Sequence, residues 1–340
     1  PRESGQFKQL AKMIAIHYHK EVHLISEKNI KKYQNYRKLV AKFNNYLDTT
    51  QIHMTGKTWD KINFENVTSK TLFLNKESFL NRKNIDEEHR HICKYNFQQF
   101  ITSKKQNGNC LKNNNTVMPH LLVRSVLKNM ANNDDCNGDT MDMLNMQWNG
   151  LMNTLENGNF MKNSYCFPCI DVSPSMMSDN AIPLQCAIGL GLACSQLCKH
   201  NRAFTFSSDP EWIQYNLTET FVERVQKTKN SGWGSTTNIH KMFKRILNTC
   251  LNKEEENKKV PQSEIDNTCL IIFSDMQFDC HEMYNEEELF QVIRREYKEC
   301  GYDNIPFLIF WNLRSTNTFP TIEKSKNMLH GRKFWIWSFR

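Results

Sequence analysis

Two short segments carry oxygen-bearing side chains at points where strands are expected to end. Asp171-x-Ser173-x-Ser175 directly follows an apolar run at residues 166–170, and Asp275 directly follows a second apolar run. Carboxylate and hydroxyl oxygens are hard ligands that suit Mg²⁺ or Mn²⁺. Hydroxyl ligands add no negative charge, so a bound cation would keep positive character and open positions for an anion. The sequence therefore predicts a divalent-cation site that binds a carboxylate or a phosphate and does not require turnover.

Between these segments lies a glycine-rich loop, residues 232–238, which opens an expected helix and contains two threonines. The loop could grip a phosphate instead, but no Gly-Lys-[Ser/Thr] follows it, which argues against a Walker site. Trp233 could stack a base or pack at the rim of the site. Asp171 and Asp275 could also be simple helix caps at strand–helix turns, a common use of Asp.

The elements that must position these residues alternate in type through the second half of the chain. Such an alternation predicts a doubly wound, mostly parallel sheet, whose sites lie at the carboxyl ends of the strands. The expected strands cover residues 166–172, 202–206, 268–273, 305–311 and 334–339, and the expected helices cover 182–199, 218–229, 238–252 and 286–299.

The first half of the chain shows helical periodicity and no strand–helix alternation. Helices are expected over residues 5–47, 86–104, 119–131 and 141–153, with a more irregular stretch at 48–84. The predicted fold class is therefore α+α/β, with a mostly helical region at 1–160 followed by a doubly wound α/β domain at 161–340.

Positive charge is concentrated in the helical part. The chain has 44 Lys and Arg against 36 Asp and Glu, a net charge of +8. Residues 1–130 alone carry a surplus of about thirteen, whereas residues 161–340 are close to neutral. This surplus is a candidate footprint for a polyanion such as RNA. The alternative, that scattered lysines keep a helical array soluble, is equally compatible with the spread-out pattern.

The 12 cysteines show no repeating spacing. The one C-x-x-C pair, Cys166 and Cys169, falls on an expected strand, where residues three apart point to opposite faces. The pair is thus poorly placed to share a zinc ion. Reduced, buried thiols in a cytoplasmic protein are the favoured interpretation.

Asparagine is unusually common, with 39 residues, which suggests an AT-rich genome such as that of a large DNA virus or a protist. No run approaches the roughly 20 apolar residues of a membrane span, and residues 1–10 do not resemble a signal peptide. We therefore expect a cytoplasmic location, in the host or in the virion for a viral protein, and no membrane contact.

The site pattern resembles the metal-ion-dependent adhesion site of von Willebrand factor type A domains. The matching residues are Asp171, Ser173, Ser175, Thr237 and Asp275. The resemblance implies that the three hydroxyls coordinate the cation directly and that the two carboxylates act mainly through bound waters. Thr237 is preferred over its neighbour Thr236 because it and the following Asn directly precede an apolar helix pattern.

A wider resemblance covers roughly residues 54–315 and points to domain-of-unknown-function family 2828, which has members in giant DNA viruses. That family joins a helical region to an A-type domain and is similar to the ring-shaped Ro autoantigen, whose helical (TROVE) repeats bind RNA. The segments that carry the resemblance are Met54, 59–62, 67–70, 119–120, Trp148, 273–279 and 310–314, whereas 328–340 departs from the pattern.

Together these observations predict a non-enzymatic binding protein with a Mg²⁺ or Mn²⁺ site and RNA as a partner of the basic helical half. The alternative is a metal-dependent protein–protein scaffold, with an acidic partner at the cation and a place in a virus particle. No catalytic triad or Cys–His pair is identifiable by spacing, so a metal-dependent phosphoesterase is the third option. The oligomeric state is left open.

Overall fold

The structure is a computed structural model, and its described residues fall into two compact units. Among the described residues, the first unit comprises 34–67 and 74–100, and the second comprises 68–73 and those from 101 onward. The predicted division between 1–160 and 161–340 stays a prediction. The described residues are 34–108, 111, 117–131, 138–158, 165–206, 209–231, 238–251, 259–275, 286–314 and 328–330.

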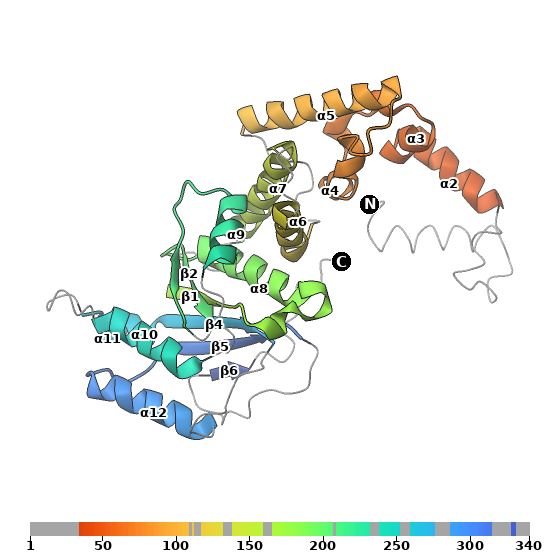
Figure 1. Ribbon diagram of the computed structural model, residues 1–340. Coiled ribbons are helices and arrows are strands. Elements are labelled where there is room, and N and C mark those ends of the chain that lie inside the picture. The colour runs from red at the N-terminus through yellow and green to blue at the C-terminus, as the bar shows by residue number, and fades with distance from the viewer. Residues whose placement is uncertain are drawn as a thin grey trace. The chain divides into compact units, whose positions relative to one another are not determined.

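The second unit is built on a six-stranded sheet in the order β3-β2-β1-β4-β5-β6 (Figure 1). All neighbouring strands are parallel except β2 and β3, which pair antiparallel. The strand order reverses between β1 and β4, which makes their carboxyl ends the switch point of the sheet. The predicted fold class is confirmed. The strands are β1 Tyr165–Asp171, β2 Arg202–Phe206, β3 Trp212–Gln214, β4 Thr268–Ser274, β5 Phe307–Asn312 and β6 Met328–His330.

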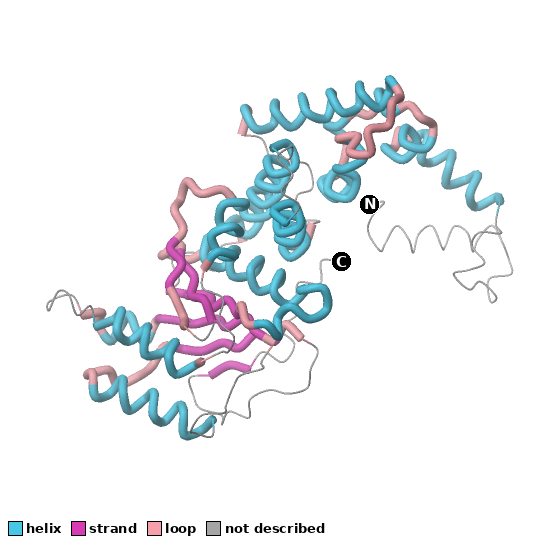
Figure 2. The backbone as a smooth tube through the Cα atoms, in the orientation of Figure 1, coloured by secondary structure: helices cyan, strands magenta, loops and turns pink. Residues whose placement is uncertain are grey.

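Helices cover both faces of this sheet (Figure 2). Helices α10 (Ile239–Leu251) and α12 (Glu286–Glu299) bury their apolar faces on one side in a core with Cys169, Phe204 and Leu270. The 3.6-residue spacing of apolar side chains on both helices accounts for this burial. Helix α8 (Ser178–Leu197) covers the other face. The short helix α11 (Gln262–Asp266) precedes β4.

Helix α8 is packed closely on both sides because two of its residues lack a side chain. A Cβ atom on Gly191 would lie 2.5 Å from the Cγ1 of Ile170 in β1. A Cβ atom on Gly189 would lie 3.0 Å from the Cβ of Pro119, the first residue of helix α6 (Pro119–Ala131). Helices α7 (Gly138–Asn157) and α9 (Phe221–Asn230) complete this outer layer.

The first turn of α8 is irregular, since Asp179, Asn180 and Ala181 have φ of 51°, 58° and 59°. Regular helix therefore begins at Ile182, as the sequence predicts, with Pro183 in the first turn, where proline is tolerated.

The first unit contains helices α2 (Gln34–Tyr46) and α3 (Thr50–Thr55) and two short 3₁₀ helices, η3 (Trp59–Lys61) and η4 (Phe64–Asn66). The boundary between the two units falls within helices α4 (Ser69–Phe79) and α5 (Glu88–Gln106). The expectation of an irregular 48–84 is wrong, because α4 and the shorter helices occupy most of this stretch. Their order depends on a cluster of aromatic rings, Phe64, Phe79 and Phe97, whose centroids lie 5.1–5.6 Å apart.

Two short strands, β3 and β6, were not expected from the sequence. The expected strand at 334–339 and the expected helix over 5–33 lie outside the described residues. No helix in the described part of the chain is long and apolar enough to cross a membrane.

Candidate metal site

The candidate site begins at the carboxyl end of β1, where the chain leaves the sheet. Asp171 is the last residue of the strand, and its Oδ1 accepts a hydrogen bond from the Ser173 backbone N–H at 2.9 Å. A 3₁₀ turn, η6 (Pro174–Met177), follows directly and is closed by a bond from the Met176 N–H to the Ser173 carbonyl. This tight turn brings both serine hydroxyls back over the strand end.

The two hydroxyls meet the carboxylate that follows β4. The Oγ atoms of Ser173 and Ser175 are 3.0 Å apart, and Ser175 Oγ donates to Asp275 Oδ1 at 3.3 Å. Ser274, the last residue of β4, donates from its hydroxyl to Asp171 Oδ2. The structure thus brings four of the five predicted residues into one network. Thr237 lies outside the described residues.

Burial makes this network electrostatically costly. Asp171 and Asp275 have no exposed surface and Ser173 has 5%, so the site opens toward solvent at the half-buried Ser175. The pKa of Asp171 is raised from 3.8 to about 6, chiefly by burial and to a smaller extent by the neighbouring Asp275. Hydrogen bonds from Ser274 and Ser173 oppose this rise in pKa. Two carboxylates held close together in a dry site are stabilised by a cation between them.

One charged residue of the site was not predicted. Arg314 follows the end of β5, and its Nη1 lies 3.4 Å from Asp275 Oδ2. The sequence placed Arg314 only in a segment of family resemblance and gave it no role. The available signal was a basic residue just beyond the strand next to β4, but strand adjacency cannot be read from the sequence.

The donor set fits a hard divalent cation. It consists of carboxylate and hydroxyl oxygens, which Mg²⁺ and Mn²⁺ prefer. Among the described residues, no group of three or more His, Cys, Asp or Glu is placed to hold a metal ion. The candidate site has two carboxylates, so it would depend on its serine hydroxyls for the remaining protein ligands.

Comparison with family models divides the chain in two. Residues 7–160 match the model of "Domain of unknown function (DUF2828)", and residues 165–331 match that of "Domain of unknown function (DUF7788)". The predicted resemblance to DUF2828 is confirmed over residues 7–160. The C-terminal segments expected to share it, 273–279 and 310–314, fall within the DUF7788 match instead.

Comparison with individual proteins gives a giant-virus relative. The chain is 27% identical over 292 residues to "Uncharacterized protein L728" of Acanthamoeba polyphaga mimivirus, covering 84% of this chain and 47% of the relative. The chain thus spans about half the length of this relative. Among solved structures, the Deinococcus radiodurans RO (RSR) protein aligns with a TM-score of 0.42 and 13% identity, over 78% of this chain and 50% of that chain.

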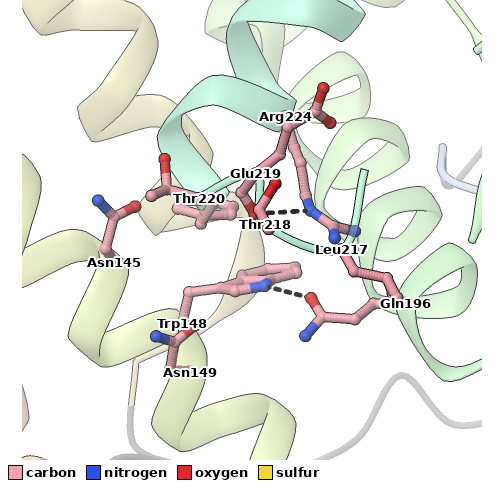
Figure 3. A pocket seen from close by; sticks show the side chains of 10 residues that line it. Asn145, Trp148, Asn149, Gln196, Leu217, Thr218, Glu219, Thr220 and Arg224 are labelled. Atoms are coloured by element: carbon pink, nitrogen blue, oxygen red, sulfur yellow. Dashed lines mark hydrogen bonds between the residues drawn. The ribbon is translucent and has the colours of Figure 1, made fainter. Parts of the chain in front are cut away.

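The DUF2828 and DUF7788 segments meet at a polar cavity of about 220 Å³ in the second unit (Figure 3). On the DUF2828 side, the indole of Trp148 donates to Gln196 Oε1 at 3.0 Å and stacks on Phe221 at 4.3 Å. On the DUF7788 side, Arg224 donates to the carbonyls of Asn216 and Glu219. Trp148 therefore joins α7 to α8 and α9.

The C-x-x-C thiols lie on opposite faces of β1. Cys169 belongs to the core beneath α10 and α12, whereas Cys166 contacts Cys198 and Cys269. These contacts and burial raise the pKa of Cys166 above the ordinary thiol value. Because the two thiols face apart, the pair is not a shared zinc site.

Proposed function

We propose that the chain is a non-enzymatic binding protein whose DUF7788 part holds a divalent cation, Mg²⁺ or Mn²⁺. One observation carries the proposal: two fully buried carboxylates and two serine hydroxyls converge at the switch point of the sheet. Ser173 and Ser175 would supply hydroxyl ligands, with Asp171 and Asp275 supplying negative charge. Thr237 would add a third hydroxyl, as the resemblance to A-type domains implies.

The bound cation would supply an electrophilic centre with positions open to an anion. The protein residues would hold it from the buried side, because Asp171 and Asp275 lie beneath the half-buried Ser175. An acidic group of a partner would then reach the cation from solvent.

The test is calorimetric titration of the full chain with Mn²⁺. We expect one site, weakened at least about tenfold by Ser175→Ala and lost in the double variant Asp171→Ala/Asp275→Ala. Ser263→Ala is the matched control, because this exposed serine lies on α11, outside the site network. Failure of the wild-type chain to bind Mn²⁺ at millimolar concentration would contradict the proposal.

A second candidate function is RNA binding by the basic N-terminal part. Helix α2 exposes two aromatic side chains, Phe43 at 47% and Tyr46 at 86%, beside the exposed Lys38 and Lys42. Exposed rings next to lysines are suited to stacking on bases while the ammonium groups contact phosphates. This arrangement and the charge surplus of residues 1–130 support RNA as the partner.

Filter binding of single-stranded and structured RNA tests this second function. We expect affinity that falls steeply with salt and drops about tenfold or more in Phe43→Ala/Tyr46→Ala. Neutralising Lys38 and Lys42 to Gln should weaken binding and flatten its salt dependence. Salt-insensitive or absent binding would instead favour the scaffold, in which an acidic protein partner is captured with Mg²⁺ and released by EDTA.

A further inference from the structure

Arg314 reaches from a buried carboxylate to solvent. Its Nη1 lies 3.4 Å from Asp275 Oδ2, while the other oxygen of Asp275 accepts the hydroxyl of Ser175. The Asp275 side chain has no exposed surface, whereas the Arg314 side chain is 26% exposed. Arg314 therefore contacts the candidate metal site through Nη1, and part of its side chain is exposed to solvent.

The backbone at Leu313 and Arg314 is hydrogen-bonded to the ends of two strands of the sheet. The Arg314 N–H donates to Asn312 Oδ1 at 2.8 Å, and the Leu313 N–H donates to the Ser274 carbonyl at 2.9 Å. Arg314 is thus anchored to the carboxyl ends of β5 and β4, the strand that precedes Asp275. A charged group held this way loses less conformational freedom when it binds a ligand.

The charges at the site favour an anion once a cation is present. Asp171 and Asp275 together offset the two charges of a divalent cation, and Arg314 then leaves a surplus of one positive charge. A guanidinium presents a planar fork that matches the oxygens of a carboxylate or a phosphate. Its contact with Asp275 involves Nη1 at the long distance of 3.4 Å, so the fork is not committed to a two-bond pair with that carboxylate.

We infer that Arg314 is the second anchor for the anionic ligand: one oxyanion group of the partner bridges the cation and the guanidinium. The inference rests on the proposed cation site and gives it a ligand class, a carboxylate or a phosphate monoester. Arg314 also competes with the cation for Asp275. It therefore lowers cation affinity and raises anion affinity, and these two effects have opposite signs.

The test uses the full chain, Mn²⁺, and two probes, phenyl phosphate and benzoate, measured by calorimetry. We expect Arg314→Gln to bind Mn²⁺ several-fold more tightly than wild type, because a like charge has been removed. The same variant should bind the preferred probe at least about tenfold more weakly in saturating Mn²⁺. The probe that wild type binds more tightly identifies phosphate or carboxylate as the ligand class. Arg294→Gln, an exposed arginine on α12, is the matched control and should change neither affinity.

Arg314→Lys keeps the positive charge but removes the planar fork. This variant should bind Mn²⁺ about as tightly as wild type and bind the probe more weakly. It keeps the inference testable if the Gln variant does not fold. Two outcomes would overturn the role of Arg314 without affecting the proposed cation site. One is unchanged probe affinity in a folded Arg314 variant that still binds Mn²⁺. The other is that Mn²⁺-loaded wild type binds neither probe. Absence of Mn²⁺ binding by wild type would overturn the proposed cation site itself.

Discussion

Replacing Asp171 by Asn is expected to stabilise the cation-free protein, although it removes a site residue. The side chain is fully buried, and burial raises its pKa from 3.8 to about 6. An asparagine keeps an oxygen to accept the Ser173 N–H, and the Ser274 hydroxyl can turn to accept from the new amide. The variant therefore loses the buried charge and keeps a hydrogen-bond partner for both Ser173 and Ser274.

The expected gain follows from the pKa of Asp171. A shift of about two units corresponds to a destabilisation of about 3 kcal/mol at pH 7.5, where the carboxylate is ionised in both the folded and unfolded states. The pKa of Asp171 is higher in the folded state than in the unfolded state. The destabilisation is therefore absent below about pH 4, grows between about pH 4 and pH 6, and is constant at higher pH. At pH 5.0 the cost is about half as large.

The assay is urea unfolding in EDTA at pH 5.0 and pH 7.5, for wild type, Asp171→Asn and Asp171→Ala. The Asn variant should be more stable than wild type by about 3 kcal/mol at pH 7.5 and by about half that at pH 5.0. The Ala variant lacks the oxygens that accept hydrogen bonds from Ser173 and Ser274, so it should gain less stability than the Asn variant. In Mg²⁺, wild type should be stabilised and Asp171→Asn should not. An Asn variant less stable than wild type at pH 7.5, or a gain that does not change with pH, would refute the reasoning.

Three further predictions concern packing and thiol chemistry. Gly189→Ala should cost about 1–3 kcal/mol in urea unfolding because its Cβ meets the Pro119 backbone, whereas Gly138→Ala, in open space, should cost nothing. Arg224→Met should cost about 2–4 kcal/mol, since Arg224 is only 3% exposed and its guanidinium donates to one side-chain oxygen and two carbonyls. A loss of stability below about 1 kcal/mol would contradict this prediction. Burial raises the pKa of Cys93 to about 11, so a thiol reagent at pH 8 should modify it at least about 100-fold more slowly in the native protein than in urea.

The long elements of the second half could be predicted because each carries its own periodic signal. The apolar runs before Asp171 and Asp275 became β1 and β4, and the helical patterns between strands became α8, α10 and α12. The three-residue strands β3 and β6 were missed, since three residues are too few to show a period. The stretch at 48–84 was misjudged because its helices depend on rings distant in the sequence, such as Phe64 and Phe97.

The sequence by itself determined which oxygen-bearing residues stand at strand ends, because residue type and local period are properties of the chain. Only the tertiary structure decided which strand ends are neighbours, and therefore that Ser175 meets Asp275 across 100 residues. It also decided the burial that raises the pKa of Asp171 and the contact of Arg314 with Asp275. The physical reason is that desolvation and Coulomb interactions depend on distance in space, which the order of strands in the sheet sets and the local sequence does not.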